Sequence, residues 1–305
     1  YIMIVVTGAA GFIGSNLVKR LNNDYPYEKI YLVENFLHPS SYINLLDLKF
    51  EDIISLENID KFLSNYKKDI KVIFHQGAIS DTKFNNLGEI MKINYDFSKK
   101  IFDFSVKNKI KFIYASSASV YGNQKSNLQI PLNIYAYSKY IFDNYVLNVS
   151  KKIRDIQFAG LRYFNVYGHN EFHKHNMSSM PYQMIKQLKN NNSINLFKGH
   201  DGYNDGEQMR DFVHVNNCVD VNILFYENNY SGIFDVGTTS PVTFNHIAKT
   251  IIDKHGSGKI KYIDMPVDLR DKYQNYTCSK KEFFHKIINF SKFEEVVETL
   301  FQKIN

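Results

Sequence analysis

Short runs of β-branched and aromatic residues alternate along the chain with longer stretches in which apolar residues recur every three or four positions. The short runs predict strands and the longer stretches predict amphipathic helices. Strands alternating with helices indicate βαβ units, whose parallel sheet is covered by helices on both faces. In chain order we expect a strand at 4–6, a helix through 16–21, strands at 30–33 and 72–74, a helix at 90–106, a strand at 112–114, a helix at 134–149 and a strand at 156–163.

After about residue 165 this regular alternation stops. A polar loop, one short helix at 182–188 and a turn rich in Gly, Asp and Asn at 199–206 occupy the next stretch. Strand patterns return at 211–213 and 232–236. The later part of the chain is therefore expected to be smaller and discontinuous, with segments that return to the first part.

Composition narrows the classes of protein. The chain has 305 residues, enough for one large domain or two moderate ones. Hydrophobic residues make up 44% and charged residues 22%, which excludes an intrinsically disordered chain. No run of about 18 apolar residues exists, and the apolar run at 2–6 is too short for a signal peptide. We expect a soluble cytoplasmic protein.

Charge and metal-ligating residues exclude further classes. The formal net charge of +6 is dispersed without a basic block, so we expect neither a nucleic-acid nor a membrane partner. Cys218 and Cys278 form no Cys-x-x-Cys pair, and the spacing of His169, His173 and His175 fits no metal motif. No metal is expected.

A glycine-rich segment follows the first predicted strand and opens the first predicted helix. Its residues are Gly8-Ala9-Ala10-Gly11-Phe12-Ile13-Gly14. Glycines at this spacing permit a tight turn, close approach of the backbone to a pyrophosphate, and close helix–strand packing. The N-terminal N–H groups of the helix then face the phosphates. The segment predicts a dinucleotide-binding loop.

This loop indicates the fold class. The expected fold is α/β, with a Rossmann-type doubly wound parallel sheet and a smaller, discontinuous C-terminal substrate-binding domain. The dinucleotide-binding domain is expected to span 1–165, with returning segments at about 211–240 and 275–300. Residues 166–210 and 241–274 are expected to form the substrate-binding domain.

Glu34 ends the second predicted strand, 26 residues after Gly8. An acidic residue at this place binds the 2′-hydroxyl of the adenosine ribose and repels a 2′-phosphate. No Lys or Arg follows until Lys49. These residues alone favour NAD over NADP.

A tyrosine four residues before a lysine on a helix can form an acid/base pair, because both side chains lie on one face and an ammonium lowers the pKa of a phenol. The chain contains this spacing six times, so the spacing alone identifies no site. The tyrosines are Tyr25, Tyr95, Tyr121, Tyr135, Tyr182 and Tyr276.

Context selects Tyr135 with Lys139. Tyr135 opens an amphipathic helix and follows Ser117 by 18 residues. Ser117 ends a predicted strand, at the sheet edge where α/β proteins place their sites. The other five tyrosines precede turns, lack a hydroxyl-bearing strand end before them, or fall beyond the dinucleotide domain.

These segments together resemble the extended short-chain dehydrogenase/reductase family. The matching segments span nearly the whole chain in the order of that family: 7–14, 114–122, 135–139, 162–168 and 210–215. Within the family, residues 74–80 and 131–135, and Lys174 shortly after Asn165–Gly168, resemble the branch of 6-epimerases that act on ADP-activated heptoses.

The resemblance implies an isomerase. It would interconvert ADP-D-glycero-D-manno-heptose and ADP-L-glycero-D-manno-heptose at C6 by transient oxidation and re-reduction with a bound nicotinamide cofactor. The product would serve lipopolysaccharide inner-core synthesis. The resemblance also implies NADP as the cofactor and a homo-oligomer, a pentamer. NADP conflicts with the preference drawn from Glu34. Because the resemblance covers nearly the whole chain, NADP is the first expectation and NAD the alternative.

The resemblance assigns roles to individual residues. Tyr135 and Lys174 would be the two acid/base groups, Ser117 would bond the reacting oxygen, and Lys139 would hold the nicotinamide ribose and tune Tyr135. Arg210 would clamp the diphosphate. The expected cofactor contacts are Gly8, Gly11, Phe12, Ile13, Gly14, Glu34, Asn35, Gln76, Gly77, Ala78, Ile79, Ser80, Asn94, Lys139 and Val166. The expected substrate contacts are Asn165, Asn176, Gln183, Phe197, Lys198, Gly199, His200, Arg210 and Tyr273.

Other functions remain open from the sequence. A UDP-hexose 4-epimerase shares the core motifs and differs chiefly at Lys174 and the substrate loops. A nucleotide-sugar 4,6-dehydratase would carry an Asp-Glu pair after the active-site hydroxyl, where this chain has Ala118-Ser119. A non-catalytic dinucleotide-binding sensor would typically lack the pair Tyr135 and Lys139.

Overall fold

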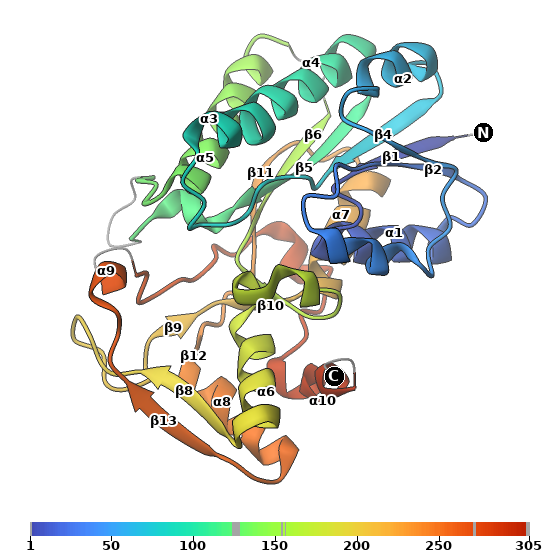
Figure 1. Ribbon diagram of the computed structural model, residues 1–305. Helices are drawn as coiled ribbons and strands as arrows, with labels where there is room; N and C mark the ends of the chain where they lie inside the picture. Colours follow the sequence, from blue (N-terminus) through green and yellow to red (C-terminus); the bar gives the residue numbers. More distant parts are fainter. Residues whose placement is uncertain (1, 124–128, 154, 156, 271–272, 303–305) are drawn as a thin grey trace.

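The core of the protein is a parallel sheet of seven strands (Figure 1). The structure is a computed structural model that describes residues 2–123, 129–153, 155, 157–270 and 273–302. The strand order confirms the predicted α/β doubly wound fold, because the chain runs outward from β1 in one direction and then from β4 in the other. In spatial order the strands are β11 (Gly232–Val236), β6 (Phe158–Tyr163), β5 (Lys111–Ser117), β4 (Ile70–His75), β1 (Met3–Thr7), β2 (Lys29–Val33) and β3 (Asp52–Ile54).

Strand β1 shows how the sheet is buried on both faces. Successive side chains of a strand point to opposite faces. Ile4 and Val6 pack into one apolar cluster with helices α1 (Phe12–Asp24) and α7 (Val215–Glu227). Met3 and Val5 pack into a second cluster on the other face. The helices of that face are α2 (Ile59–Tyr66), α4 (Ser98–Asn108) and α5 (Ile134–Ser150).

The helix expected at 90–106 is longer and less regular than predicted. It begins as α3 (Leu87–Ile90), passes through the π-helical stretch η2 (Met91–Phe97) and continues as α4. The strand expected at 156–163 begins at Phe158 in the described chain, and residue 156 lies outside the described residues.

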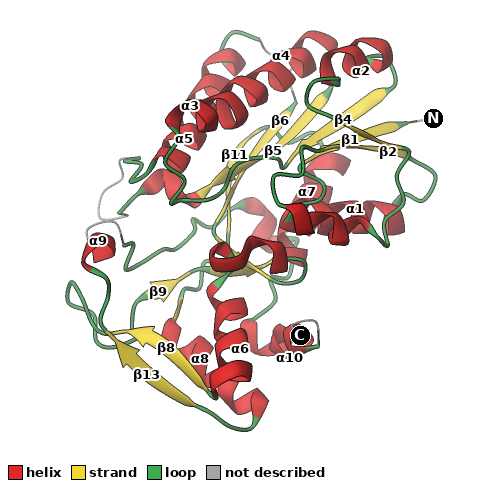
Figure 2. Cartoon of the chain, in the orientation of Figure 1, coloured by secondary structure: helices red, strands yellow, loops and turns green. Residues whose placement is uncertain are grey.

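A smaller lobe lies beside the carboxyl ends of the strands (Figures 1 and 2). Its own apolar cluster joins Met184 and Ile185 of α6 to Ile247 of α8 and Val297 of α10. A two-stranded parallel sheet completes it. The elements of this lobe are α6 (Met180–Asn191), β8 (Ser193–Phe197), α8 (Phe244–His255), β13 (Lys259–Ile263) and α10 (Phe293–Phe301).

Short elements connect the sheet with the smaller lobe. Two further pairs of strands form here, β7 with β10 and β9 with β12. The division into a dinucleotide domain and a substrate domain stays a proposal. The connecting elements are η1 (Pro39–Leu45), η3 (Ala118–Tyr121), β7 (Asn165–Tyr167), η4 (Phe172–Met177), β9 (Met209–Arg210), β10 (Phe212–His214), β12 (Val242–Thr243), α9 (Val267–Arg270) and η5 (Phe283–Lys286).

In the described part of the chain, no helix is long and apolar enough to cross a membrane. The same residues contain no group of three or more His, Cys, Asp or Glu side chains placed to hold a metal ion.

Candidate active site

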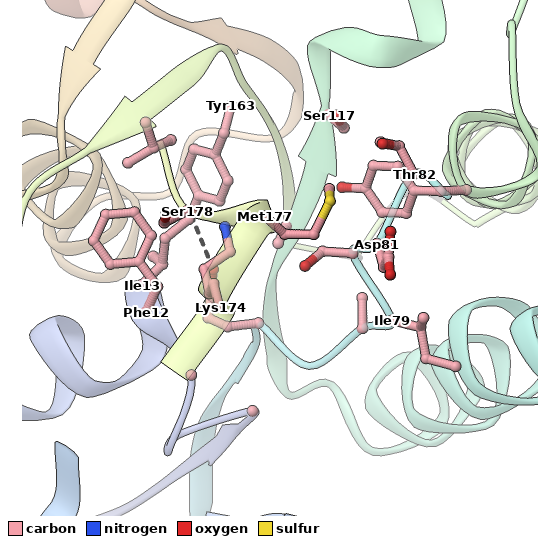
Figure 3. Close-up of a pocket in the computed structure, with 18 of the residues that line it drawn as sticks. Phe12, Ile13, Ile79, Asp81, Thr82, Ser117, Tyr163, Lys174, Met177 and Ser178 are labelled. Atoms are coloured by element: carbon pink, nitrogen blue, oxygen red, sulfur yellow. Dashed lines mark hydrogen bonds between the residues drawn. The ribbon is translucent and has the colours of Figure 1, made fainter. Parts of the chain in front are cut away.

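A cavity of about 850 Å³ opens at the carboxyl ends of the parallel strands, between the sheet and the smaller lobe. Doubly wound sheets bind ligands at this edge, where the strand order reverses. The dinucleotide loop, the ends of β4 and β5, helix α5 and the loop η4 all contribute to its wall. Figure 3 shows side chains from these separate segments converging on the cavity.

The glycine loop leaves room for a pyrophosphate because side chains are excluded from it. Gly8 has φ of +65°, and a Cβ there would lie 2.4 Å from Cα of Gly77. A Cβ on Gly14 would lie 2.1 Å from the carbonyl oxygen of Gly8. Among the described residues, no side chain caps the N-terminus of α1, so its N–H groups are directed at the cavity. This cradle fits the pyrophosphate of a nicotinamide dinucleotide.

The carboxylate of Glu34 is held at the end of β2. Its Oε2 accepts a hydrogen bond from the backbone N–H of Ala10 at 2.9 Å, and its Oε1 accepts one from Asn35 N–H at 3.0 Å. Glu34 and Asn35 both line the cavity. A fixed carboxylate therefore faces the space beside the glycine loop.

The segment after β4 forms the neighbouring wall. The predicted residues Gln76, Gly77, Ala78, Ile79 and Ser80 all line the cavity. The expected cofactor contact Asn94 does not line it, because its side chain is fully buried behind this wall. Its Oδ1 accepts from Ile79 N–H at 2.8 Å and its Nδ2 donates to the Ile79 carbonyl at 2.9 Å. Asn94 thus supports the wall from behind, by holding the backbone of Ile79 in place.

Tyr135, Lys139 and Ser117 meet in the cavity. Asn133 caps α5 by accepting from Ala136 N–H at 2.8 Å, which places Tyr135 in the first turn. Ser117 ends β5, and its side chain and that of Tyr135 both line the cavity. The Ser117 oxygen accepts hydrogen bonds from the N–H of Ser119 at 3.2 Å and from its hydroxyl at 2.8 Å. Of the six tyrosines with a lysine four residues later, all of them in the described chain, only Tyr135 lines the cavity.

Lys139 lies one helical turn after Tyr135 and also lines the cavity. The ammonium of Lys139 donates to the carbonyl of Ala115 at 2.7 Å. Burial raises the pKa of Tyr135, and the hydroxyl of Ser117 opposes the rise. Burial also lowers the pKa of Lys139 to about 8, opposed by the charge of Asp143. Desolvation therefore dominates both groups.

Lys174 enters the cavity from η4, on a different wall from Ser117 (Figure 3). Its Nζ lies 5.5 Å from the centre of the Phe12 ring, a cation–π distance. Burial lowers the pKa of Lys174, and the charge of Glu171 opposes this. A lysine with a lowered pKa can exchange a proton nearer neutral pH than an exposed one.

Arg210 lines the far part of the cavity between two aromatic rings. Its guanidinium carbon lies 4.9 Å from the ring centre of Tyr273 and 5.5 Å from that of Phe244. The carboxylate of the neighbouring Asp211 accepts hydrogen bonds from the side chains of Thr238 and Ser279 rather than from Arg210. Nη1 of Arg210 donates to the carbonyl of Met209 at 2.9 Å, and the other N–H groups of the guanidinium can bind an anionic group.

Three predicted substrate contacts are among the described residues but do not line the cavity. Lys198 forms an ion pair with Asp264 at 3.1 Å, and His200 lies 3.3 Å from Asp201. Gly199 lines a separate shallow hollow. The remaining predicted contacts do line the cavity: Gly8, Gly11, Phe12, Ile13, Gly14, Val166, Asn165, Asn176, Gln183, Phe197 and Tyr273.

The sequence analysis missed several wall residues. Asp81 and Thr82 directly follow Ser80, and Met177 and Ser178 follow Lys174 in η4 (Figure 3). Position just after a strand end could have indicated Asp81 and Thr82. No comparable signal marks Met177 and Ser178, because their loop is placed by contacts with the smaller lobe.

A substitution at Arg210 tests whether this part of the cavity binds an anionic group. Replacing Arg210 by Lys keeps one positive charge and removes the planar fork that binds two phosphate oxygens. Loss of a charge-assisted hydrogen bond costs about 1.5–3 kcal/mol, so we expect KM for a nucleotide-sugar substrate to rise about tenfold or more. Steady-state kinetics would measure this, with exposed Lys186→Arg as control; an unchanged KM would contradict the assignment.

Comparisons with known proteins agree with this geometry. The sequence profile of the NAD dependent epimerase/dehydratase family matches residues 4–237. The ADP-L-glycero-D-manno-heptose-6-epimerase of Brachyspira hyodysenteriae is 41% identical over 319 aligned positions, covering 97% of this chain and 98% of the relative. The crystal structure of the Helicobacter pylori ADP-L-glycero-D-manno-heptose-6-epimerase has a TM-score of 0.77 and 34% identity, covering 86% of this chain and 85% of the other.

A third similar structure is the UDP-N-acetylglucosamine 4-epimerase of Methanobrevibacter ruminantium, solved with UDP-N-acetylmuramic acid. It has a TM-score of 0.84 and 26% identity, and the match covers 99% of this chain and 96% of the other.

Proposed function

The chain belongs to the NAD dependent epimerase/dehydratase family, and from this premise we propose that it interconverts the D-glycero and L-glycero forms of ADP-manno-heptose by inverting C6. The observation that carries the proposal is that Tyr135 with Ser117 and, from another wall, Lys174 line one cavity. The similarity to two heptose 6-epimerases supports this substrate over a UDP-hexose.

Inversion requires removal of the C6 hydrogen and its return to the opposite face of the carbon. A bound nicotinamide dinucleotide supplies the acceptor and donor of hydride. Tyr135 takes the proton of the C6 hydroxyl, and Ser117 holds the same oxygen by a hydrogen bond. The sugar then turns over, and Lys174 supplies a proton to the oxygen from the other wall. Lys139 orients the ribose beside Tyr135, and Arg210 holds the diphosphate.

For the cofactor we propose NAD rather than the NADP implied by the family resemblance. Backbone N–H groups of Ala10 and Asn35 fix the Glu34 carboxylate, which can still accept from a ribose hydroxyl. A 2′-phosphate there would be repelled. Residues 33–41 contain no Lys or Arg to offset that repulsion.

We expect the nucleotide released from denatured purified protein to be NAD. Glu34→Ala should weaken retention of NAD about tenfold or more, because a hydrogen bond to a charged group contributes about 1.5–3 kcal/mol. Mass spectrometry of the released nucleotide and titration of stripped protein would measure both. Exposed Glu51→Ala is the control. Release of NADP from the wild-type protein would contradict the assignment.

The activity is tested with purified protein, without added cofactor. NMR should follow the interconversion of the two ADP-manno-heptose epimers. Epimerisation of UDP-glucose with no action on the ADP-heptose would make the protein a 4-epimerase instead. Retention of nucleotide without turnover of either sugar would make it a non-catalytic sensor.

The location that fits this activity is the cytoplasm, where nucleotide-activated sugars and dinucleotide cofactors are made. Its product would serve lipopolysaccharide inner-core synthesis. The resemblance further supports a homo-oligomer, a pentamer, which light scattering after size-exclusion chromatography would test.

A further inference from the structure

One buried carboxylate ties together the two ends of the loop that carries Lys174. Oε1 of Glu171 accepts from Gly168 N–H at 3.2 Å and from the Ser179 hydroxyl at 2.7 Å, and Oε2 accepts from Ser179 N–H. Gly168 follows β7, and Ser179 is the N-cap of α6. The side chain of Glu171 therefore closes the loop 168–179 across its base.

Closing the loop has a conformational reason. His175, directly after Lys174, has φ of 47° and ψ of −117°, and Asn170 has φ of 70°. Non-glycine residues at positive φ are strained, and they persist only where the surrounding structure holds them. Lys174 sits between this strained residue and the anchor at Glu171. Its own N–H donates to the carbonyl of Glu171 at 3.0 Å.

The negative charge of Glu171 has an effect outside the hydrogen bonds that close the loop. Its side chain is 1% exposed, and burying a carboxylate is costly unless it is paired and hydrogen-bonded. A neutral amide could not close the loop in the same way, because its NH2 group cannot accept the bond from Ser179 N–H. Burial raises the pKa of Glu171, and the hydrogen bonds from Ser179 and the charge of Lys174 oppose the rise. The ionised carboxylate that these groups favour adds a negative charge three residues from Lys174, whose ammonium lies over the Phe12 ring inside the cavity.

We propose that Glu171 is a positioning residue for Lys174: it closes the loop that presents the ammonium to the cavity, and its charge keeps that ammonium protonated in the resting enzyme. The proposal rests on the proposed function, which makes Lys174 an acid/base group.

The other titratable groups nearby do not replace this charge. Within the loop, His173 has its pKa lowered to about 4, by burial first and then by the charges of His38, Lys174 and His175. His173 is therefore neutral near pH 7. His38, the residue before η1, faces it with ring centres 5.7 Å apart. Tyr182 of α6 faces Glu171 and has a raised pKa, so it is also neutral.

The sign of the effect follows from these charges. Burial lowers the pKa of Lys174, and Glu171 opposes that fall. Removing the charge while keeping the shape should therefore lower the pKa of Lys174 further. Removing one hydrogen bond while keeping the charge should leave that pKa in place.

The experiment compares Glu171→Gln with Ser179→Ala in the cofactor-loaded protein. The Lys174 amine is labelled by ¹³C reductive methylation, assigned by its absence in Lys174→Met, and titrated by NMR. We expect Glu171→Gln to lower the pKa of Lys174 by about one unit and Ser179→Ala to leave it unchanged. Both variants lose a hydrogen bond, so both should lower Tm.

An unchanged pKa in Glu171→Gln would overturn the proposal, as would an equal fall in Ser179→Ala. If Glu171→Gln does not fold, Glu171→Asp draws the charge back by one methylene and should give a smaller fall; no fall there would be equally decisive. This titration does not depend on the sugar substrate, so its outcome is separate from that of the proposed function. In active protein, Glu171→Gln should cause no further loss of kcat in a Lys174→Met background.

Discussion

Tyr135→Phe should lower kcat for heptose epimerisation by about three orders of magnitude, within the range that general acid–base catalysis contributes. The substitution removes the phenol hydroxyl, which faces the same cavity as Ser117, and leaves the ring in place. Bound nucleotide should be retained, since the glycine loop is untouched. Steady-state NMR kinetics and the quantity of nucleotide released on denaturation would measure the two effects.

Tyr137→Phe is the matched control, because Tyr137 lies on the same helix and is 46% exposed. It should keep wild-type kcat. A Tyr135→Phe variant that also keeps wild-type kcat would show that another group takes the C6 hydroxyl proton.

The same residue determines the pH dependence. Burial raises the pKa of Tyr135, so the phenol is protonated at neutral pH in the structure described here. Proton removal from the C6 hydroxyl needs the phenolate, so kcat should rise as the pH increases from neutral. The rise should stop where Lys174 begins to lose the proton that it supplies, because burial lowers the pKa of Lys174. The rising limb of the profile should be absent in Tyr135→Phe.

Lys174→Met should lower kcat by about two orders of magnitude while nucleotide remains bound. Methionine keeps an unbranched side chain against Phe12 and removes the ammonium. Exposed Lys186→Met on α6 is the control and should be neutral. Full activity in Lys174→Met would contradict the scheme with two acid/base groups and leave Tyr135 as the one such residue.

The features that could be predicted from the sequence are those that depend on local chemistry. Glycines at 8 and 14 are required by backbone contacts that leave no space for a Cβ, and a Cβ at 11 would lie only 3.0 Å from the carbonyl oxygen of Gly8. Tyr135 differs from the five other tyrosines in its position: it lies in the first turn of the α-helix that follows the strand ending in Ser117. Strand ends of a parallel sheet meet at one edge, so such residues come together without knowledge of the rest of the fold.

Features that depend on distant packing could not be predicted. Helix α7 is buried on nearly all sides, so its sequence has no amphipathic repeat. Lys198 does not line the cavity, and its ammonium pairs with Asp264, 66 residues later in the chain. Asn94 lies in a π-helical stretch that directs its amide to Ile79 rather than into the cavity.

The order of the strands also bears on how the chain folds during synthesis. Strand β11 pairs with β6 at the edge of the large sheet, and α7 covers one face of that sheet. Both are synthesised after α6 and β8 of the smaller lobe. Until they emerge from the ribosome, β6 presents an unpaired edge and the face that α7 shares with α1 is only partly covered. Both features favour aggregation. A fragment that stops at residue 165 would retain these exposed surfaces permanently, and we expect it to be insoluble.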